Sequence, residues 1–221
     1  MSKVVVDIET IGIEFENLDD KSKDYLLKYA KDDEERDKIK ESLALSPLTG
    51  EIVAIGMFNP DTRKGIMYYQ GGLNDSDFTE NDILFKVKSE SEMLANFWAD
   101  IKKYKQVVTF NGRTFDGPFL HLRSAILKIK SSRNLVPYRY DYKLHCDLLD
   151  QMTYYGASRR FNLDFYTKRF GIRSPKEEGI DGSMVSQMFK DGRQKEIAQY
   201  CARDIKATTQ LYEYWENYLK F

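Results

Sequence analysis

The chain has few of the residues that form disulfides, zinc sites or histidine-dependent active sites. Its 221 residues include two cysteines and two histidines. Cys146 and Cys201 lack CxxC spacing, and neither His121 nor His145 has a partner at ligand spacing, which argues against a zinc-binding scaffold. We therefore expect all four side chains to be structural, and we expect a reducing, cytoplasmic setting.

The sequence also lacks long apolar runs and an excess of charge of either sign. No run approaches the roughly 20 residues that a membrane-spanning helix needs, and no signal peptide precedes the first strand, so no membrane association is expected. Lys and Arg total 34 against 35 Asp and Glu, so any binding of nucleic acid must be local. Hydrophobic residues make up 42% of the chain, enough for a buried core, and we predict one domain over residues 1–221.

The order of the predicted elements indicates an α/β fold, a mixed β-sheet flanked by α-helices. Apolar and β-branched runs predict strands at residues 3–8, 51–58, 64–70 and 106–110. Amphipathic patterns with glycine or charge signals at their ends predict helices at 89–104, from about 116, at 146–156, 162–171 and 183–192, and from about 193 to the C-terminus. Acids and bases alternate through residues 14–46, which predicts a charged helical insertion on the surface.

Two carboxylates lie at the end of the first predicted strand. In VVVDIET, Asp7 and Glu9 are two residues apart, so both side chains leave the same face of the sheet. Carboxylates that close a run of three valines must be compensated against burial, either by a metal ion or by hydrogen bonds at the sheet edge.

Two further segments carry carboxylates that could join them. Asp116 follows a strand and the Asn111-Gly112 turn, where an aspartate could equally be a helix N-cap. Tyr200 and Asp204 are four apart and share one face of the last helix, although such pairs also arise by chance. The occurrence of all three motifs in one order favours a shared site.

The three motifs VVVDIET, FNGRTFD and YCARD resemble those of the DEDD superfamily of 3′-to-5′ exonucleases, in its tyrosine branch, which has an RNase H-like fold. HCDLLDQMTYYG, FNLDFYTKRFGI and GIDGSMV are similar to predicted exonucleases related to the proofreading domain of family B DNA polymerases. Gln199 stands where the histidine branch has its histidine, which disfavours that branch. The insertion at 14–46 departs from the compact pattern.

The resemblance implies a hydrolase that uses two divalent metal ions, Mg²⁺ or Mn²⁺, bound by Asp7, Glu9, Asp116 and Asp204. Tyr200 would position the attacking water. The resemblance also implies that the terminal nucleotide contacts Thr10 and Ile11 in a pocket lined by Asn111 and Phe115.

A cluster of basic and aromatic residues between residues 159 and 173 includes Arg160 and Phe161 and could hold phosphates and stack unpaired bases. The alternative is an amphipathic helix whose aromatic residues belong to the core. The expected partner is single-stranded DNA with a free 3′ end, as in DNA repair. An exoribonuclease or a catalytically silent nucleic-acid-binding module on the same fold are the alternatives.

Overall fold

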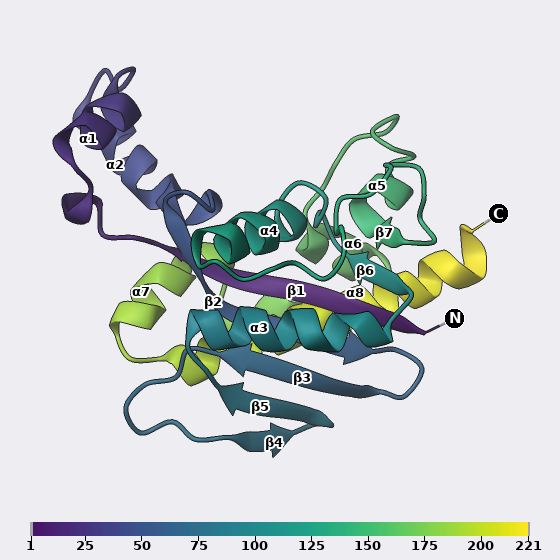
Figure 1. Ribbon diagram of the computed structural model, residues 1–221. Helices are drawn as coiled ribbons and strands as arrows, with labels where there is room; N and C mark the ends of the chain where they lie inside the picture. Colours follow the sequence, from purple (N-terminus) through teal and green to yellow (C-terminus); the bar gives the residue numbers. More distant parts are fainter. Residues whose placement is uncertain (1, 221) are drawn as a thin grey trace.

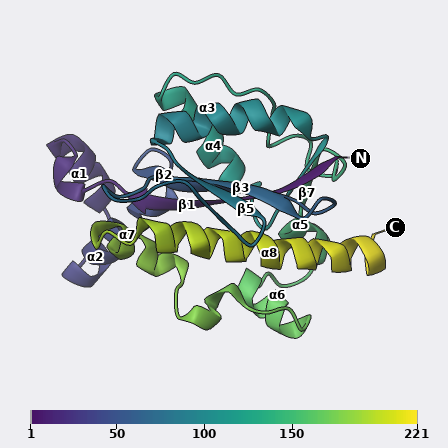
Figure 2. The same cartoon turned by 90° about the horizontal axis from the view of Figure 1, so that it is seen from below.

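A computed structural model describes residues 2–220, apart from the side chains of residues 177 and 178, and shows a mixed seven-stranded sheet between two layers of helices (Figures 1 and 2). The strands are β1 (Lys3–Gly12), β2 (Gly50–Asn59), β3 (Lys64–Tyr69), β4 (Phe78–Glu80), β5 (Ile83–Val87), β6 (Gln106–Thr109) and β7 (His145–Asp147), in the order β4-β5-β3-β2-β1-β6-β7. The predicted α/β fold with a mixed sheet is confirmed.

The central strand β1 is antiparallel to β2 and parallel to β6, which is in turn parallel to β7. One face of the sheet is covered by α3 and α4 and the other by α8, with α6 and α7 beside it (Figure 2). The helices are α1 (Asp20–Leu27), α2 (Asp33–Glu41), α3 (Glu90–Asp100), α4 (Asp116–Ile126), α5 (Leu148–Met152), α6 (Leu163–Arg169), α7 (Val185–Lys190) and α8 (Gln194–Tyr218).

The alternation of side chains along β1 shows on which face of the sheet Asp7 and Glu9 lie. Val4, Val6 and Ile8 are buried in the cluster that includes residues of α3 and α4. Val5 is buried against residues of α8. Because alternate residues of a strand share a face, Asp7 and Glu9 lie on the α8 face with Val5.

A glycine in β2 allows α8 to approach the sheet at the level of the first motif. Gly56 pairs with Asp7 across the ladder. A Cβ atom at Gly56 would lie 2.0 Å from Cδ1 of Ile205, a residue of α8 next to Asp204. The bare backbone at Gly56 therefore makes room for the part of the helix that carries the third motif.

Three short strands were not predicted from the sequence. The sequence patterns assigned no element to the residues of β4 and β5, which have three and five residues. The helix predicted from Cys146 instead begins at Leu148, because Cys146 belongs to β7 and the Asp147 carboxylate caps α5 by accepting from the backbone N–H of Leu149 and Asp150.

The charged segment 14–46 contains α1 and α2, and neither helix has a buried residue. The C-terminal end of the segment, unlike its helices, contacts the core. Leu43 in the 3₁₀ turn Ser42–Leu45 is buried, and the Thr10 hydroxyl donates to the Ala44 carbonyl at 2.7 Å. In Figure 1 α1 and α2 project away from the sheet. No helix within residues 2–220 combines the length and apolarity needed to cross a membrane.

Candidate active site

The first motif is at a bulge in the central strand. Pairing of β1 with β2 shifts register between Glu9 and Thr10. Glu9 is buried, whereas Asp7 is half-buried and lines a cavity. Three atoms lie within 4.8 Å of one another: a carboxylate oxygen of Asp7, a carboxylate oxygen of Glu9 and the Sγ atom of Cys201.

Helix α8 brings three functional groups, those of Tyr200, Cys201 and Asp204, against β1. Tyr200 is buried, and its phenol is close enough to the Asp204 carboxylate one turn later for each group to shift the pKa of the other. The Cys201 thiol donates to an Asp7 carboxylate oxygen at 3.5 Å and lies 3.7 Å from the Asp7 carbonyl oxygen. Cys201 is thus a buried free thiol as expected, but it also fixes a predicted metal ligand.

The second motif is a turn held by an aspartate that sequence analysis did not select. Asn111 has a left-handed backbone, with φ of 66°. The Asp147 carboxylate at the end of β7 accepts from the backbone N–H of Asn111 and of Arg113, both at 2.9 Å. This arrangement fixes the loop that leads from β6 into α4. In the sequence Asp147 lies within the predicted helix at 146–156 and within the family-like segment HCDLLDQMTYYG, but no carboxylate pattern singled it out.

Asp116 is the first residue of α4 and not its cap. Phe115 occupies the N-cap position, without a side-chain cap, so the alternative interpretation of Asp116 is wrong. The Asp116 side chain is buried, and its Oδ1 atom has no hydrogen-bond partner among the described residues. A buried carboxylate oxygen without a partner is costly unless a cation or water compensates it.

The four carboxylates are close enough to raise one another's pKa. Burial raises the pKa of Asp7 well above its ordinary value, and the negative charges of Asp116, Asp204 and Glu9 raise it further. Burial also raises the pKa of Glu9, with Asp204 and Asp116 adding to the effect. The pKa of Asp116 and that of Asp204 are each raised to about 7, chiefly by burial. Without a compensating cation, the fully ionised cluster is therefore strained by like charge.

These residues fit a divalent cation of the Mg²⁺ or Mn²⁺ type. All four candidate ligands offer carboxylate oxygens, which suit these ions. Burial and the charge of Asp7 raise the pKa of the Cys201 thiol well above its ordinary value, so the thiol stays protonated and acts as a donor. The orphaned Asp116 oxygen leaves an open coordination position on the second motif.

A cavity of about 200 Å³ opens beside the carboxylates. Besides Asp7, Tyr200 and Asp204, it is lined by residues that sequence analysis did not place there: Phe110, Asn162, Leu163, Asp164, Pro175 and Lys176. The positive charge of Lys176 lowers the pKa of Asp204, so its ammonium group acts on the site. Lys176 belongs to no motif and could not be selected from the sequence.

The five predicted substrate contacts occupy different environments. Thr10 is buried with its hydroxyl used by Ala44, and Ile11 is buried in an apolar cluster that includes the Tyr200 ring. Asn111 and Phe115 are half-buried on the loop beside Asp116. Arg160 is exposed, 3.5 Å from the Asp150 carboxylate. Their contacts with a nucleotide remain predictions.

The basic cluster is partly core and partly surface. Tyr166 and Phe170 pack against the buried residues of the α8 layer, as the alternative interpretation expected. Phe161 and the 46% exposed Phe165 stack with their ring centroids 4.3 Å apart, next to the cavity residue Asn162. This stacked pair therefore flanks, in the chain, two residues that line the cavity, Asn162 and Leu163.

Comparison with known proteins gives consistent matches. Residues 52–218 match the family described as a predicted 3′-5′ exonuclease related to the exonuclease domain of PolB. The chain is 24% identical over 183 residues to DNA polymerase 1 of Sulfurisphaera ohwakuensis, a match that covers 75% of this chain and 20% of that protein. The fold is similar to that of the family B DNA polymerase of Pyrobaculum calidifontis, with a TM-score of 0.62 and 16% identity over 97% of this chain and 24% of the polymerase. The chain thus spans about a fifth of the length of the curated relative that it matches.

Proposed function

Because this chain belongs to the family of predicted 3′-5′ exonucleases related to the exonuclease domain of PolB, we propose that it removes nucleotides from the 3′ end of single-stranded DNA with the help of two divalent metal ions. The proposed metal ligands are Asp7, Glu9, Asp116 and Asp204. The DNA preference comes from the family relationship to DNA polymerases, and an RNA substrate is an outcome of the test below.

The observation that carries the proposal is that four carboxylates from β1, α4 and α8 lie close enough for their charges to interact, and that two of them, Asp7 and Asp204, line one cavity. Each has its pKa raised by burial, and several raise one another's. A fold gains nothing in stability from such a cluster, so its assembly supports a functional role. Bound divalent ions would neutralise the cluster, activate water and stabilise negative charge on the phosphate and the leaving 3′ oxygen.

The chain's own groups hold this chemistry in position. Burial, with the charge of Asp204 next in size, raises the pKa of the Tyr200 phenol far above its ordinary value, so Tyr200 cannot accept a proton at neutral pH. Its role is to orient water by hydrogen bonding. Cys201 holds the Asp7 carboxylate, and Asp147 holds the loop before Asp116. The Lys176 ammonium group would attract the phosphate.

The direct test uses oligonucleotides labelled at the 5′ end. Single-stranded DNA, a 3′-recessed duplex and RNA are each incubated with Mg²⁺, Mn²⁺ or EDTA. We expect a ladder that shortens by one nucleotide at a time from the 3′ end of single-stranded DNA, and no ladder in EDTA. The Asp7→Ala variant, purified in parallel, controls for contaminating nucleases.

Two results would contradict the proposal. One is the absence of hydrolysis with every substrate in both metals. The other is cleavage of a circular single-stranded DNA, because an enzyme that needs a 3′ end cannot cut a circle. A ladder on RNA but not on DNA would retain the reaction and replace the substrate.

A further inference from the structure

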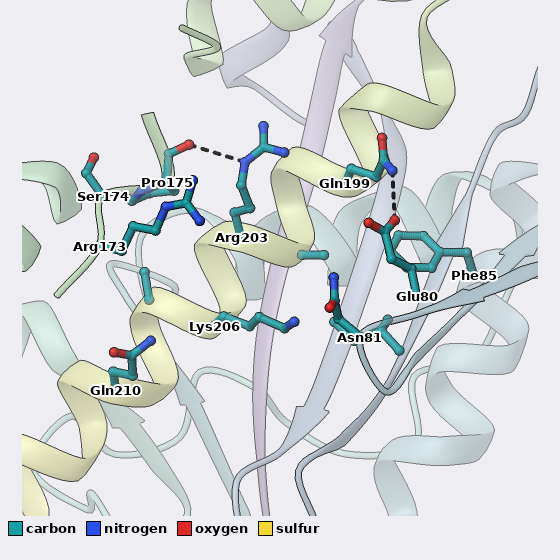
Figure 3. A pocket seen from close by; sticks show the side chains of 13 residues that line it. Glu80, Asn81, Phe85, Arg173, Ser174, Pro175, Gln199, Arg203, Lys206 and Gln210 are labelled. Carbon is teal, nitrogen blue, oxygen red and sulfur yellow. Dashed lines mark hydrogen bonds between the residues drawn. The ribbon is translucent and has the colours of Figure 1, made fainter. Parts of the chain in front are cut away.

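A second and larger cavity of about 380 Å³ lies on another side of α8, outside the proposed metal site. Its walls are the turn between β4 and β5, the segment that precedes the 3₁₀ turn at Pro175, and α8 itself (Figure 3). Among the described residues it shares only Pro175 with the first cavity. A ligand in it would contact none of the four carboxylates.

The residues of α8 that line this cavity form a single stripe. Gln199, Arg203, Lys206 and Gln210 are spaced by four, three and four residues, so they lie on one face of the helix. Tyr200 and Asp204 each follow a member of the stripe by one residue and are turned by about 100° from it. One helix therefore presents neighbouring faces to the two cavities.

The polar side chains of the second cavity carry an excess of positive charge. Arg173, Arg203 and Lys206 line it together with one carboxylate, that of Glu80. That carboxylate already accepts a hydrogen bond from the Gln199 side chain at 2.7 Å. In Figure 3 the Lys206 side chain extends from α8 towards Asn81, across the cavity from Arg173 and Pro175.

Of the three cations that line this cavity, Lys206 makes the fewest polar contacts with the described residues. It is half-buried, and within the described part of the chain no ion pair, hydrogen bond or aromatic contact is formed by its ammonium group. Its ammonium group is therefore available to an anion that enters the cavity. Asn81 and Gln210 add amide donors at the same cavity.

Arg203 and Pro175 connect the two cavities. The Arg203 Nε–H donates to the Pro175 carbonyl oxygen at 3.3 Å, and the Arg203 guanidinium lies 5.7 Å from the centre of the Tyr200 ring. Pro175 lines both cavities. An anion bound beside Arg203 would thus be one side chain away from the candidate catalytic tyrosine.

We propose that this second cavity binds a phosphate group of a nucleotide, outside the proposed metal site, through Lys206, Arg203 and Arg173. Cationic and amide donors match phosphate oxygens, and the volume lies in the range of small-ligand sites. The phosphate can come from a released mononucleotide or from a phosphodiester of the strand. The choice of nucleotide phosphate rests on the proposed function, but the test does not depend on catalysis.

The test measures binding in EDTA, where metal-dependent hydrolysis is absent. Thymidine 5′-monophosphate is titrated by calorimetry, and a fluorescent 15-residue oligothymidylate is titrated by anisotropy. Loss of one charge-assisted contact and its replacement by a negative charge should weaken binding about tenfold or more in Lys206→Glu. Lys102→Glu is the matched control, because Lys102 is exposed and follows α3 on the opposite face of the sheet.

Each arm decides a separate point. Weakening for the monophosphate supports a product site, and weakening for the oligonucleotide alone supports a strand site. Lys206→Arg should restore binding, and circular dichroism with thermal unfolding should show both variants folded. Equal binding by Lys206→Glu and Lys102→Glu would overturn the proposal. The proposal would also be overturned if a hexaglutamate peptide bound and if Lys206→Glu weakened its binding by the same factor. The cavity would then recognise negative charge in general. Failure to hydrolyse any nucleic acid would remove the proposed function and leave this binding result standing.

Discussion

At the scale of single residues, the proposed site assigns different tasks to side chains that are close together. Asp7 is the carboxylate whose pKa responds to three other carboxylates, whereas Tyr200 contributes a neutral hydroxyl. Asp7→Ala should therefore abolish nearly all hydrolysis, while Tyr200→Phe should lower it by about 10²–10⁴-fold, the usual size of an orienting or proton-transfer contribution. The loss of hydrolysis in Glu9→Ala and in Asp204→Ala should be nearly as large as that in Asp7→Ala.

Steady-state hydrolysis of one labelled oligonucleotide measures this ranking, with circular dichroism to confirm folding. Arg63→Gln is a suitable neutral control, because its ion pair with Glu213 is at the surface. Near-normal, EDTA-sensitive activity in Asp7→Ala would remove the metal assignment.

The raised pKa of Asp116 predicts a variant that is inactive but more stable. A carboxyl group whose pKa is raised to about 7 in the folded protein opposes folding at any pH above its unfolded value, and the penalty disappears as the pH falls towards that value. In EDTA at pH 7.5, Asp116→Asn should raise the free energy of unfolding by roughly 1–3 kcal/mol.

Urea unfolding at pH 7.5 and pH 4.5 tests this, because the gain should shrink at the lower pH. Mg²⁺ should stabilise the wild type more than the variant, since binding to the folded state alone adds stability. A variant less stable than the wild type at pH 7.5 in EDTA would show that the cluster is not strained.

His145 has the opposite dependence on pH. Burial lowers its pKa to about 4, and its Nε2 lies 2.8 Å from the Thr109 hydroxyl. Since the unfolded chain takes up a proton near the ordinary histidine value, the stability from neutral His145 is complete above about pH 6.5 and declines between there and pH 4. Between pH 7.5 and 5.0 this single group should account for about 2 kcal/mol.

The comparison of wild type with His145→Gln isolates that effect. The variant should lose about 2 kcal/mol less than the wild type over the same interval, measured by urea unfolding. Parallel loss in both proteins would mean that His145 is protonated in the folded state.

At the scale of elements, the sequence predicted those that carry a strong pattern. The three valines of β1, the apolar run of β2 and the long amphipathic α8 have the length and periodicity that identify them. β7 was taken for part of a helix because its three residues run into α5 without a break, and β4 is too short and polar to show alternation. Lys176 and the cavity of Lys206 depend on packing between distant segments, which no local pattern encodes.

The charged segment offers a test of which residues belong to the core. No residue of α1 or α2 is buried, but Leu43 is, and a Cβ atom at Gly12 would lie 2.9 Å from the Leu43 Cβ. Replacing residues 16–40 by a short glycine linker should therefore preserve cooperative unfolding and change its free energy by no more than about 1 kcal/mol, because surface changes are usually small.

The comparison variant is Leu43→Ala, which should cost about 2–5 kcal/mol as a buried large-to-small substitution. Urea unfolding of both proteins measures the difference. Loss of a cooperative transition in the deletion alone would place α1 and α2 in the core.

At the scale of the whole molecule, the even balance of charge makes attraction to a strand a local property. Lys and Arg total 34 and Asp and Glu 35, so the chain as a whole gives a polyanion no net attraction. The cations that line the two cavities on α8 are Lys176, Arg173, Arg203 and Lys206, and Arg160 lies on the surface near Asp150.

If three to five of these neutralise phosphates, counterion release from a single strand predicts that binding weakens by roughly 10–100-fold between 50 and 200 mM salt. An oligothymidylate with phosphorothioate linkages, which resists hydrolysis, allows the measurement in Mg²⁺ by fluorescence anisotropy. Reversing charge at Lys176 together with Lys206 should reduce the slope of log affinity against log salt by about 1.4, at 0.7 for each phosphate contact. The paired control, Lys102→Glu with Lys130→Glu, changes the net charge equally through exposed lysines near α3 and α4, and it should leave the slope unchanged. An equal reduction in both double variants would mean that the strand responds to the charge of the whole molecule, and the local path along α8 would then be wrong.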